Sequence, residues 1–162
     1  ELSVKLKQNL KEKQELIAKL EPLVVLDSAM IRDWNARSQE ILEIQKQWMA
    51  IGPVERSKTK DINKKFWQLF KGFFNRKGQF FKAMDAERQS NLEKKRALVA
   101  QANELKEQEN FEQTADQIKQ LQKEWKEIGP VPEKYRVKIY QRAFLKLPRM
   151  KISEKLGRAT EF

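Results

Sequence analysis

Four lysines in the middle of the chain have a spacing that suits electrostatic binding. Lys60, Lys64, Lys71 and Lys82 fall within about 40° of one another at the helical rotation of about 100° per residue. Each ammonium group can neutralise one phosphate of a polyanion and release its counterion. On a helix, these four side chains would form a basic stripe. They are therefore the candidate polyanion-binding residues.

The net charge of +11 is concentrated around these lysines. Residues 56–96 contain 13 Lys and Arg against 4 Asp and Glu, whereas residues 1–55 carry a net charge of −1 and residues 97–162 a net charge of +3. Three interpretations fit the basic segment: a solvated surface that keeps a helical protein in solution, a face for RNA, DNA or another polyanion, and a groove for an acidic protein. The solvated surface is the commonest of the three, and the polyanion face ranks second.

The chain lacks two of the residue types on which catalysis most often depends, because its 162 residues include neither Cys nor His. This excludes a thiolate nucleophile, an imidazole base, and zinc-finger or haem ligation. The carboxylates Glu40 and Glu43 have i, i+3 spacing, as do Glu104 and Glu107, but a di-metal carboxylate bundle also needs Glu-x-x-His. The five Gly form no phosphate-binding loop. The sequence therefore predicts a protein that is not an enzyme, with no cofactor, no metal and no evident small-molecule substrate.

An internal repeat positions the basic segment. The ten residues at 45–54 (QKQWMAIGPV) return at 122–131 (QKEWKEIGPV), an offset of 77 residues. Extended backwards at this offset, the alignment matches residues 34–51 to residues 111–128, and in both segments six positions recur at spacings of 3, 4, 3, 4 and 3, which places them on one face of an amphipathic helix. In the first segment they are Trp34, Arg37, Ile41, Ile44, Trp48 and Ile51. A second match, at an offset of 82 residues, relates residues 9–17 to residues 91–99. One unit is therefore five residues longer than the other between its first two helices.

The pattern predicts five helical stretches. They are 3–20, 28–51, 57–105, 112–128 and one that starts near Glu133. Pro22 is expected to end the first stretch, and Ser28 is expected to cap the second at its N-terminus. Gly52 is expected to supply a left-handed residue at the end of the second, before Pro53. Gly129 and Pro130 are expected to stop the fourth in the same way.

Aromatic side chains form a broad stripe on the longest stretch. The stripe covers an arc of about 160° and consists of Phe66, Phe70, Phe73, Phe80, Met84, Trp67, Phe74 and Phe81. An arc this wide needs two neighbouring helices, and short Gly-Pro connections make successive helices antiparallel. The predicted fold class is all-α, with elongated antiparallel three-helix-bundle repeats that share one long central helix.

Three aromatic or basic positions have both a structural and a functional interpretation. The rings at helical spacing are expected to form core, with Trp67 as the ring most open to solvent, where it could stack on a base. Trp48 and Trp125 are expected to cover their turns. Lys77 projects into the middle of the apolar arc, and we expect its stem to lie on the core while its amine reaches solvent. A functional buried amine is the alternative.

Three segments carry a resemblance to a known family. They are LQKEWKEIGPVP at 121–132, FFNRK at 73–77 with Phe80 and Phe81, and SNLEKK at 90–95. Over about residues 3–142, the chain resembles the bacterial helical repeat called domain of unknown function 349, which occurs in tandem copies in cytoplasmic proteins. The family has no established activity, so the resemblance implies a helical tandem fold and no catalytic residues.

The resemblance also implies a division of the chain. Residues 1–21 would close a preceding repeat unit, residues 28–105 would form a complete unit, and residues 111–142 would start the next unit. Beyond them the pattern stops: the family motif has an aromatic residue three positions after Tyr140, where this chain has Ala143, and Pro148 would break the following helix. We expect residues 143–162 to be an atypical tail, with a non-native origin such as a reading-frame shift as a hypothesis.

The sequence also predicts the cellular compartment of the protein and the kind of partner that it binds. Its longest purely apolar run, Leu23–Leu26, is far shorter than the roughly 20 residues of a membrane span. No apolar leader begins the chain, and no Cys is present to oxidise. We expect a cytoplasmic protein without membrane contact, whose partner is a nucleic acid or an acidic protein. The choice between RNA, DNA and protein stays open, as does the oligomeric state.

Overall fold

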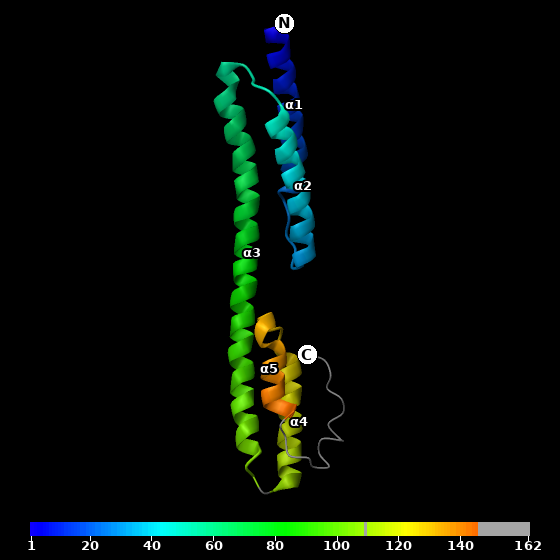
Figure 1. Cartoon of the computed structure of the whole chain (residues 1–162), viewed down its shortest axis with the longest axis vertical. Coiled ribbons are helices and arrows are strands. Elements are labelled where there is room, and N and C mark those ends of the chain that lie inside the picture. The colour runs from blue at the N-terminus through cyan, green and yellow to red at the C-terminus, as the bar shows by residue number, and fades with distance from the viewer. Residues whose placement is uncertain (109, 146–162) are drawn as a thin grey trace. The chain divides into compact units, whose positions relative to one another are not determined.

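The structure, a computed structural model, describes residues 1–108 and 110–145 of the chain. In this part of the chain every regular element is helical and no strand is present, which confirms the all-α prediction (Figure 1). The elements are α1 (Leu2–Leu23), α2 (Ile31–Ala50), α3 (Arg56–Leu105), α4 (Phe111–Glu127), the 3-10 helix η1 (Glu133–Tyr135), α5 (Arg136–Tyr140) and the π-helix η2 (Gln141–Leu145).

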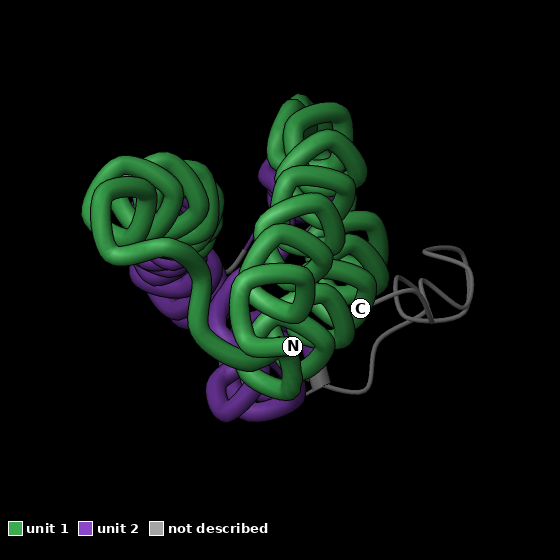
Figure 2. Tube along the Cα trace, turned by 90° about the horizontal axis from the view of Figure 1, so that it is seen from above, with its two compact units in different colours: residues 1–81 green, residues 82–162 purple. Residues whose placement is uncertain are grey.

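The chain divides into two compact units, residues 1–81 and residues 82–162, which Figure 2 shows in two colours. Helices α1 and α2 belong to unit 1, and α4, η1, α5 and η2 belong to unit 2. Helix α3 contributes residues 56–81 to unit 1 and residues 82–105 to unit 2. The long helix is therefore confirmed, with a start one residue earlier than predicted.

Unit 1 is built from three helical segments around one hydrophobic core. Helices α1 and α2 contact each other and run in opposite directions, and α3 runs opposite to α2 (Figure 1). The side chains of Leu20, Ile41, Phe66 and Phe73 are 0% exposed and come from all three segments. The helical face predicted on α2 is confirmed for the four apolar members that lie within the helix, which are all buried: Trp34, Ile41, Ile44 and Trp48. Ile51 lies just beyond the helix and is half-buried.

Ring contacts join α2 to the aromatic stripe of α3. Trp48 stacks on Phe66 with ring centroids 4.1 Å apart, and Trp34 stacks on Phe80 at 5.3 Å. The prediction that the rings form core is confirmed for these pairs. Trp67 is half-buried, with its ring 5.0 Å from Phe66 in an edge-on contact. Several Phe of the stripe are also half-buried, so Trp67 is not set apart from them by exposure.

Lys77 finds a partner inside unit 1. Its amine donates a hydrogen bond to Ser38 Oγ at 2.8 Å, and Ser38 Oγ donates to the Trp34 carbonyl at 2.7 Å. The amine also lies 5.9 Å and 5.8 Å from the ring centroids of Phe74 and Phe81. Lys77 is half-buried, and its amine has an acceptor that the sequence did not predict, the hydroxyl of the buried Ser38 on α2.

Two predicted helix ends were also wrong. Helix α1 continues through Pro22 to Leu23. Proline removes the N–H that would bond to the Ala18 carbonyl, but Ala18 and Pro22 are both exposed, so water can reach that carbonyl.

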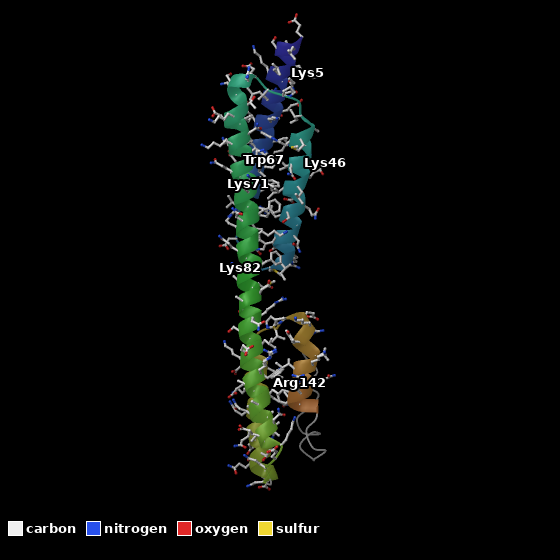
Figure 3. The ribbon with its side chains drawn as sticks, turned by 60° about the vertical axis from the view of Figure 1, so that its left-hand side comes forward. Lys5, Lys46, Trp67, Lys71, Lys82 and Arg142 are labelled. Atoms are coloured by element: carbon white, nitrogen blue, oxygen red, sulfur yellow. The ribbon has the colours of Figure 1, made fainter. Side chains whose placement is uncertain are left out.

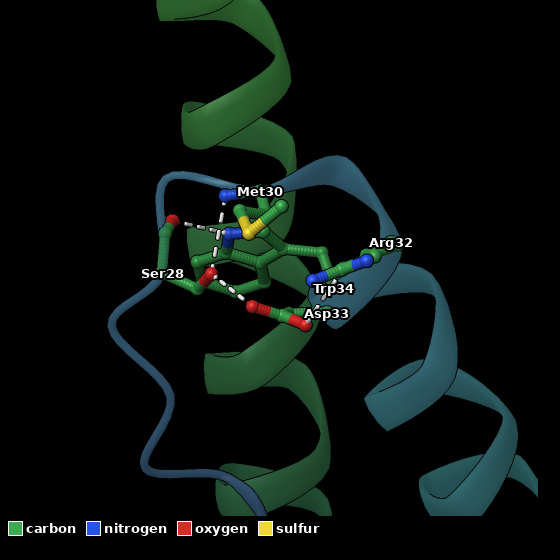
Figure 4. A network of polar contacts seen from close by, with 5 residues as sticks. All are labelled: Ser28, Met30, Arg32, Asp33 and Trp34. Atoms are coloured by element: carbon green, nitrogen blue, oxygen red, sulfur yellow. Dashed lines mark hydrogen bonds and ion pairs between the residues drawn. The ribbon is translucent and has the colours of Figure 1, made fainter.

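The second misplaced end is the start of α2. Its N-cap is Met30 and not Ser28. Ser28 instead organises the connection before the helix (Figure 4): its Oγ accepts from the Met30 N–H at 3.1 Å and donates to Asp33 Oδ2 at 2.6 Å. The Ser28 carbonyl accepts from Trp34 Nε1 at 2.9 Å. Ser28 therefore stabilises the start of the helix from a position two residues before the N-cap.

Gly52 lies in the turn after α2, and the structure gives a different reason for this glycine from the one that the sequence suggested. Asn9 Nδ2 on α1 donates to the Pro53 carbonyl at 2.8 Å. A Cβ on Gly52 would lie 2.9 Å from that nitrogen, and the φ of Gly52 lies outside the left-handed region. The expectation of a left-handed glycine was therefore wrong, and close approach of Asn9 is the reason for the glycine. Lys13, one turn after Asn9, places its amine 4.7 Å from the Trp48 ring centroid.

Unit 2 repeats this turn with corresponding residues. Asn91 Nδ2 donates to the Pro130 carbonyl at 2.9 Å, and a Cβ on Gly129 would lie 3.0 Å from that nitrogen. The Lys95 amine lies 4.7 Å from the Trp125 ring centroid. Burial lowers the pKa of the Lys95 amine, and also that of the Lys13 amine in unit 1, below the ordinary value. The turn and its Trp belong to the sequence match at an offset of 77 residues, and the Asn and Lys that contact them belong to the match at 82. In each unit, the two matched segments therefore pack against each other at this turn.

The first residues of the expected atypical tail lie in the core of unit 2. Ala143 is 0% exposed, and Phe144 packs edge-on against Trp125 with centroids 5.3 Å apart. Phe66 makes the corresponding contact to Trp48 in unit 1, but Phe144 follows it by 78 residues rather than 77. The π-helical turn η2 accommodates one extra residue and brings Phe144 to the ring. Residues 146–162, with Pro148, lie outside the described residues.

Candidate functional site

The structure divides the predicted basic stripe between the two units. Lys60, Lys64 and Lys71 belong to the unit 1 segment of α3, and Lys82 is the first residue of unit 2. All four are exposed. Figure 3 marks Lys71 and Lys82 on α3. We call Lys60, Lys64 and Lys71 the basic face of unit 1, and Lys82 is not part of it.

The surroundings of the basic face are strongly positive. The unit 1 segment of α3, residues 56–81, contains eight Lys and Arg and one acidic residue, Asp61. Lys65 on this segment pairs with Glu21 on α1 at 3.4 Å. In the described part of the chain, none of Lys60, Lys64 and Lys71 forms an ion pair. Their charges are therefore available to an external anion.

Each unit also has a surface pocket that the sequence did not reveal. The unit 2 pocket has a volume of about 220 Å³ and lies between α3 and the η1–η2 region; its lining is Leu92, Arg96, Val99, Tyr135, Lys138, Ile139 and Arg142. The unit 1 pocket has a volume of about 280 Å³ and lies between α1 and α3; its lining is Leu10, Gln14, Ile17, Lys58, Asp61, Ile62 and Lys65.

The two pockets occupy the same place in the repeat. Adding 82 to Leu10, Gln14 and Ile17 gives the three residues of the unit 2 pocket that α3 supplies. Adding 77 to the other four gives the remaining lining residues. The apolar positions of the lining are apolar in both pockets, whereas the polar positions differ in charge. The two sequence offsets relate each residue of one lining to a residue of the other. The sequence alone would have revealed this only if it had also shown which helices pack together.

Metal sites and membrane-spanning helices are two further features to consider in the described part of the chain. Within residues 1–108 and 110–145, no group of three or more Asp and Glu is arranged to hold a metal ion. None of the helices in these residues has an apolar stretch of the length that a membrane span requires. The basic face and the two pockets are the features of this surface that we consider for binding.

Comparison with known proteins identifies a family. A family model described as Domain of Unknown Function (DUF349) matches residues 1–57 and 61–134. The chain matches no curated protein and no solved structure. The matched residues cover most of the chain, both Ile-Gly-Pro-Val turns and two lysines of the basic face, Lys64 and Lys71, while Lys60 falls between the two matched segments. The resemblance seen in the sequence is therefore confirmed, and the chain belongs to the family described as Domain of Unknown Function (DUF349).

Proposed function

We propose that this protein is a non-enzymatic binding module that contacts a polyanion, RNA or DNA, through the basic face of unit 1. The observation that supports this function best is the exposure of Lys60, Lys64 and Lys71, without an ion pair in the described part of the chain. Acidic partners from the same protein would have neutralised these charges. A face that only keeps the chain in solution has no need to exclude such partners.

The spacing of the basic face suits phosphates better than bases. At about 1.5 Å per residue, Lys64 lies about 6 Å along the helix from Lys60, and Lys71 lies about 10 Å further. Flexible lysine stems can adjust to phosphates at such separations, but phosphate contacts carry no sequence information. We therefore expect binding with little preference for nucleotide sequence.

Charge reversal on the basic face tests this function. Lys60→Glu with Lys64→Glu is expected to weaken binding of a labelled single-stranded RNA or duplex DNA at least about tenfold at about 50 mM salt, because two phosphate contacts become repulsive. The measurement is fluorescence anisotropy on the full chain.

The matched control reverses two exposed lysines elsewhere in unit 1. Lys5→Glu with Lys46→Glu changes the net charge equally on α1 and α2 (Figure 3). This control is expected to stay within about twofold of the wild type at the same salt concentration. Equal losses in the two double variants would show that only net charge matters. No binding by the wild type at low salt would remove the proposed function.

A second candidate function, a scaffold or spacer that joins proteins, is favoured by a different observation. Leu42 and Met49 lie seven residues apart on α2, on one helix face, and are 40% and 68% exposed. If the chain is a scaffold, nucleic acid fails to bind even at low salt. A pull-down with the lysine variants would then lose a specific protein while their helical content is unchanged.

We further propose that the two units are copies of one antiparallel three-helix repeat that share α3, in a cytoplasmic protein. The corresponding pockets and turns support the repeat. The absence of Cys supports the compartment.

A further inference from the structure

We propose that the unit 2 pocket binds a nucleoside phosphate, with the phosphate against Lys138 and Arg142 and the base against Tyr135 and Arg96. This site is distinct from the basic face, and no residue belongs to both. The ligand is either a free nucleotide or one nucleotide of a single-stranded RNA, since both present the same chemistry.

The cations of the pocket suit a phosphate. Lys138 and Arg142 are exposed, and neither forms an ion pair with a described residue. The Lys106 amine donates to the Arg142 carbonyl at 3.0 Å and so bonds the backbone of the turn that carries Arg142. Arg96 is already paired with Glu93 at 2.8 Å. Lys138 and Arg142 are therefore the groups left to meet an anion, and a planar guanidinium can bind phosphate oxygens in pairs.

The rest of the lining suits a flat ring. Leu92 and Ile139 are 1% and 6% exposed and provide an apolar floor. The Arg96 guanidinium carbon lies 5.4 Å from the Tyr135 ring centroid, so two flat groups stand together at the wall. Nucleobases stack on both aromatic rings and guanidinium planes. A volume of about 220 Å³ is below the range of about 300–1,000 Å³ that is usual for ligand pockets, so the pocket holds one nucleotide with part of it in solvent and is too small for a larger molecule.

The backbone at the pocket is also unusual. Arg142 lies on the π-helical turn Gln141–Leu145, whereas its counterpart in unit 1, Lys65, lies on regular α-helix. Single π-helical turns occur frequently at functional sites. In this chain the turn presents Arg142 to the pocket while Phe144 packs on Trp125.

The unit 1 pocket lacks these features and serves as an internal control. Asp61 stands where unit 2 has Lys138, and Gln14 stands where it has Arg96. Lys58 replaces the Tyr135 ring, and Lys65 is paired with Glu21 at 3.4 Å. An acidic residue and the loss of both flat groups make this pocket unsuitable for a nucleoside phosphate. We therefore expect one site per chain.

Calorimetric titration of the full chain with adenosine monophosphate tests the proposal. Binding is expected at a stoichiometry of one, and Lys138→Ala with Arg142→Ala is expected to weaken it at least about tenfold, since two charge-assisted contacts are lost. Lys58→Ala with Lys65→Ala in the unit 1 pocket should leave the affinity within about twofold. Circular dichroism verifies that each variant keeps its helical content.

Further titrants identify what is bound. Inorganic phosphate and adenosine should each bind at least about tenfold more weakly than the monophosphate, because each lacks half of the contacts. A short oligoadenylate that binds more tightly than the monophosphate through the same two residues indicates RNA, and equal affinities indicate a free nucleotide. Phosphate that binds as tightly as the nucleotide overturns the proposal. It is also overturned if neither nucleotide nor oligonucleotide binding depends on Lys138 and Arg142.

A measurement on the wild type is independent of variant folding. Adding adenosine monophosphate should shift the amide resonances of residues 92–99 and 135–142 and leave those of residues 58–65 unchanged. Shifts confined to residues 58–65 contradict the proposal. Because the Lys60→Glu with Lys64→Glu variant keeps the unit 2 pocket, its nucleotide titration separates failure of this proposal from failure of the proposed function.

Discussion

Replacing Trp48 by alanine is expected to destabilise the protein by about 3–5 kcal/mol, because it removes a large buried ring and leaves a cavity. Trp48 is 3% exposed, stacks on Phe66 at 4.1 Å and lies beneath the Lys13 amine. Its removal therefore loosens all three segments of unit 1. Urea unfolding of the full chain, followed by circular dichroism, measures the loss as a shift to lower denaturant concentration.

The neighbouring Met49 provides the control for Trp48. It is 68% exposed, so Met49→Ala removes little buried surface and should change the free energy of unfolding by less than about 0.5 kcal/mol. If Trp48→Ala is as well tolerated as Met49→Ala, the ring stack does not hold α2 on α3 as described.

Adding one methyl group at Gly52 is expected to cost about 1–3 kcal/mol, although alanine is normally the better residue in ordered structure. The new Cβ would lie 2.9 Å from Asn9 Nδ2 and would displace the amide from the Pro53 carbonyl. Asn9 is 7% exposed, so water poorly replaces the lost hydrogen bond. Thermal and urea unfolding of Gly52→Ala measure this cost.

A double-mutant cycle assigns that cost to Asn9. With Asn9→Ala in place, the methyl group meets no amide, so Gly52→Ala should cost at least about 1 kcal/mol less than it does in the wild type. Gly72→Ala is a useful comparison, since a Cβ there meets no atom within 4 Å and should stabilise α3 slightly. Additive costs of the two substitutions at Asn9 and Gly52 would contradict the close approach as the reason for the glycine.

The helices of this protein are largely readable from its sequence because the apolar residues recur with helical spacing in two copies. Gly-Pro pairs located the connections after α2 and α4 to within one residue. The end of α1 was missed because Pro22 falls on a solvated side, where the lost hydrogen bond costs little. The start of α2 was missed because Ser28 bonds to the Met30 N–H and to Asp33 from a position two residues before the N-cap.

The sites are harder to predict from the sequence than the helices, because they depend on which helices pack together. Exposure of Lys60, Lys64 and Lys71 follows from the angle they make with the aromatic stripe, so their face was predictable. The pockets draw their linings from two segments with different offsets, and only the pairing of the helices brings Arg96 near Lys138 and Arg142. The role of Asn9 and Asn91 was detectable in principle, since both lie in the matched segments at the same distance from Lys13 and Lys95.

The salt dependence of RNA binding tests the role of the basic face most directly. The measurement is the slope of log Kobs against log salt between about 50 and 200 mM, for the wild type and for Lys60→Glu with Lys64→Glu. Three phosphate contacts predict a slope of about −2 or steeper for single-stranded RNA, and loss of two contacts makes it shallower by about 1.4. A wild-type slope near zero, or the same slope in both proteins, would contradict binding through these lysines.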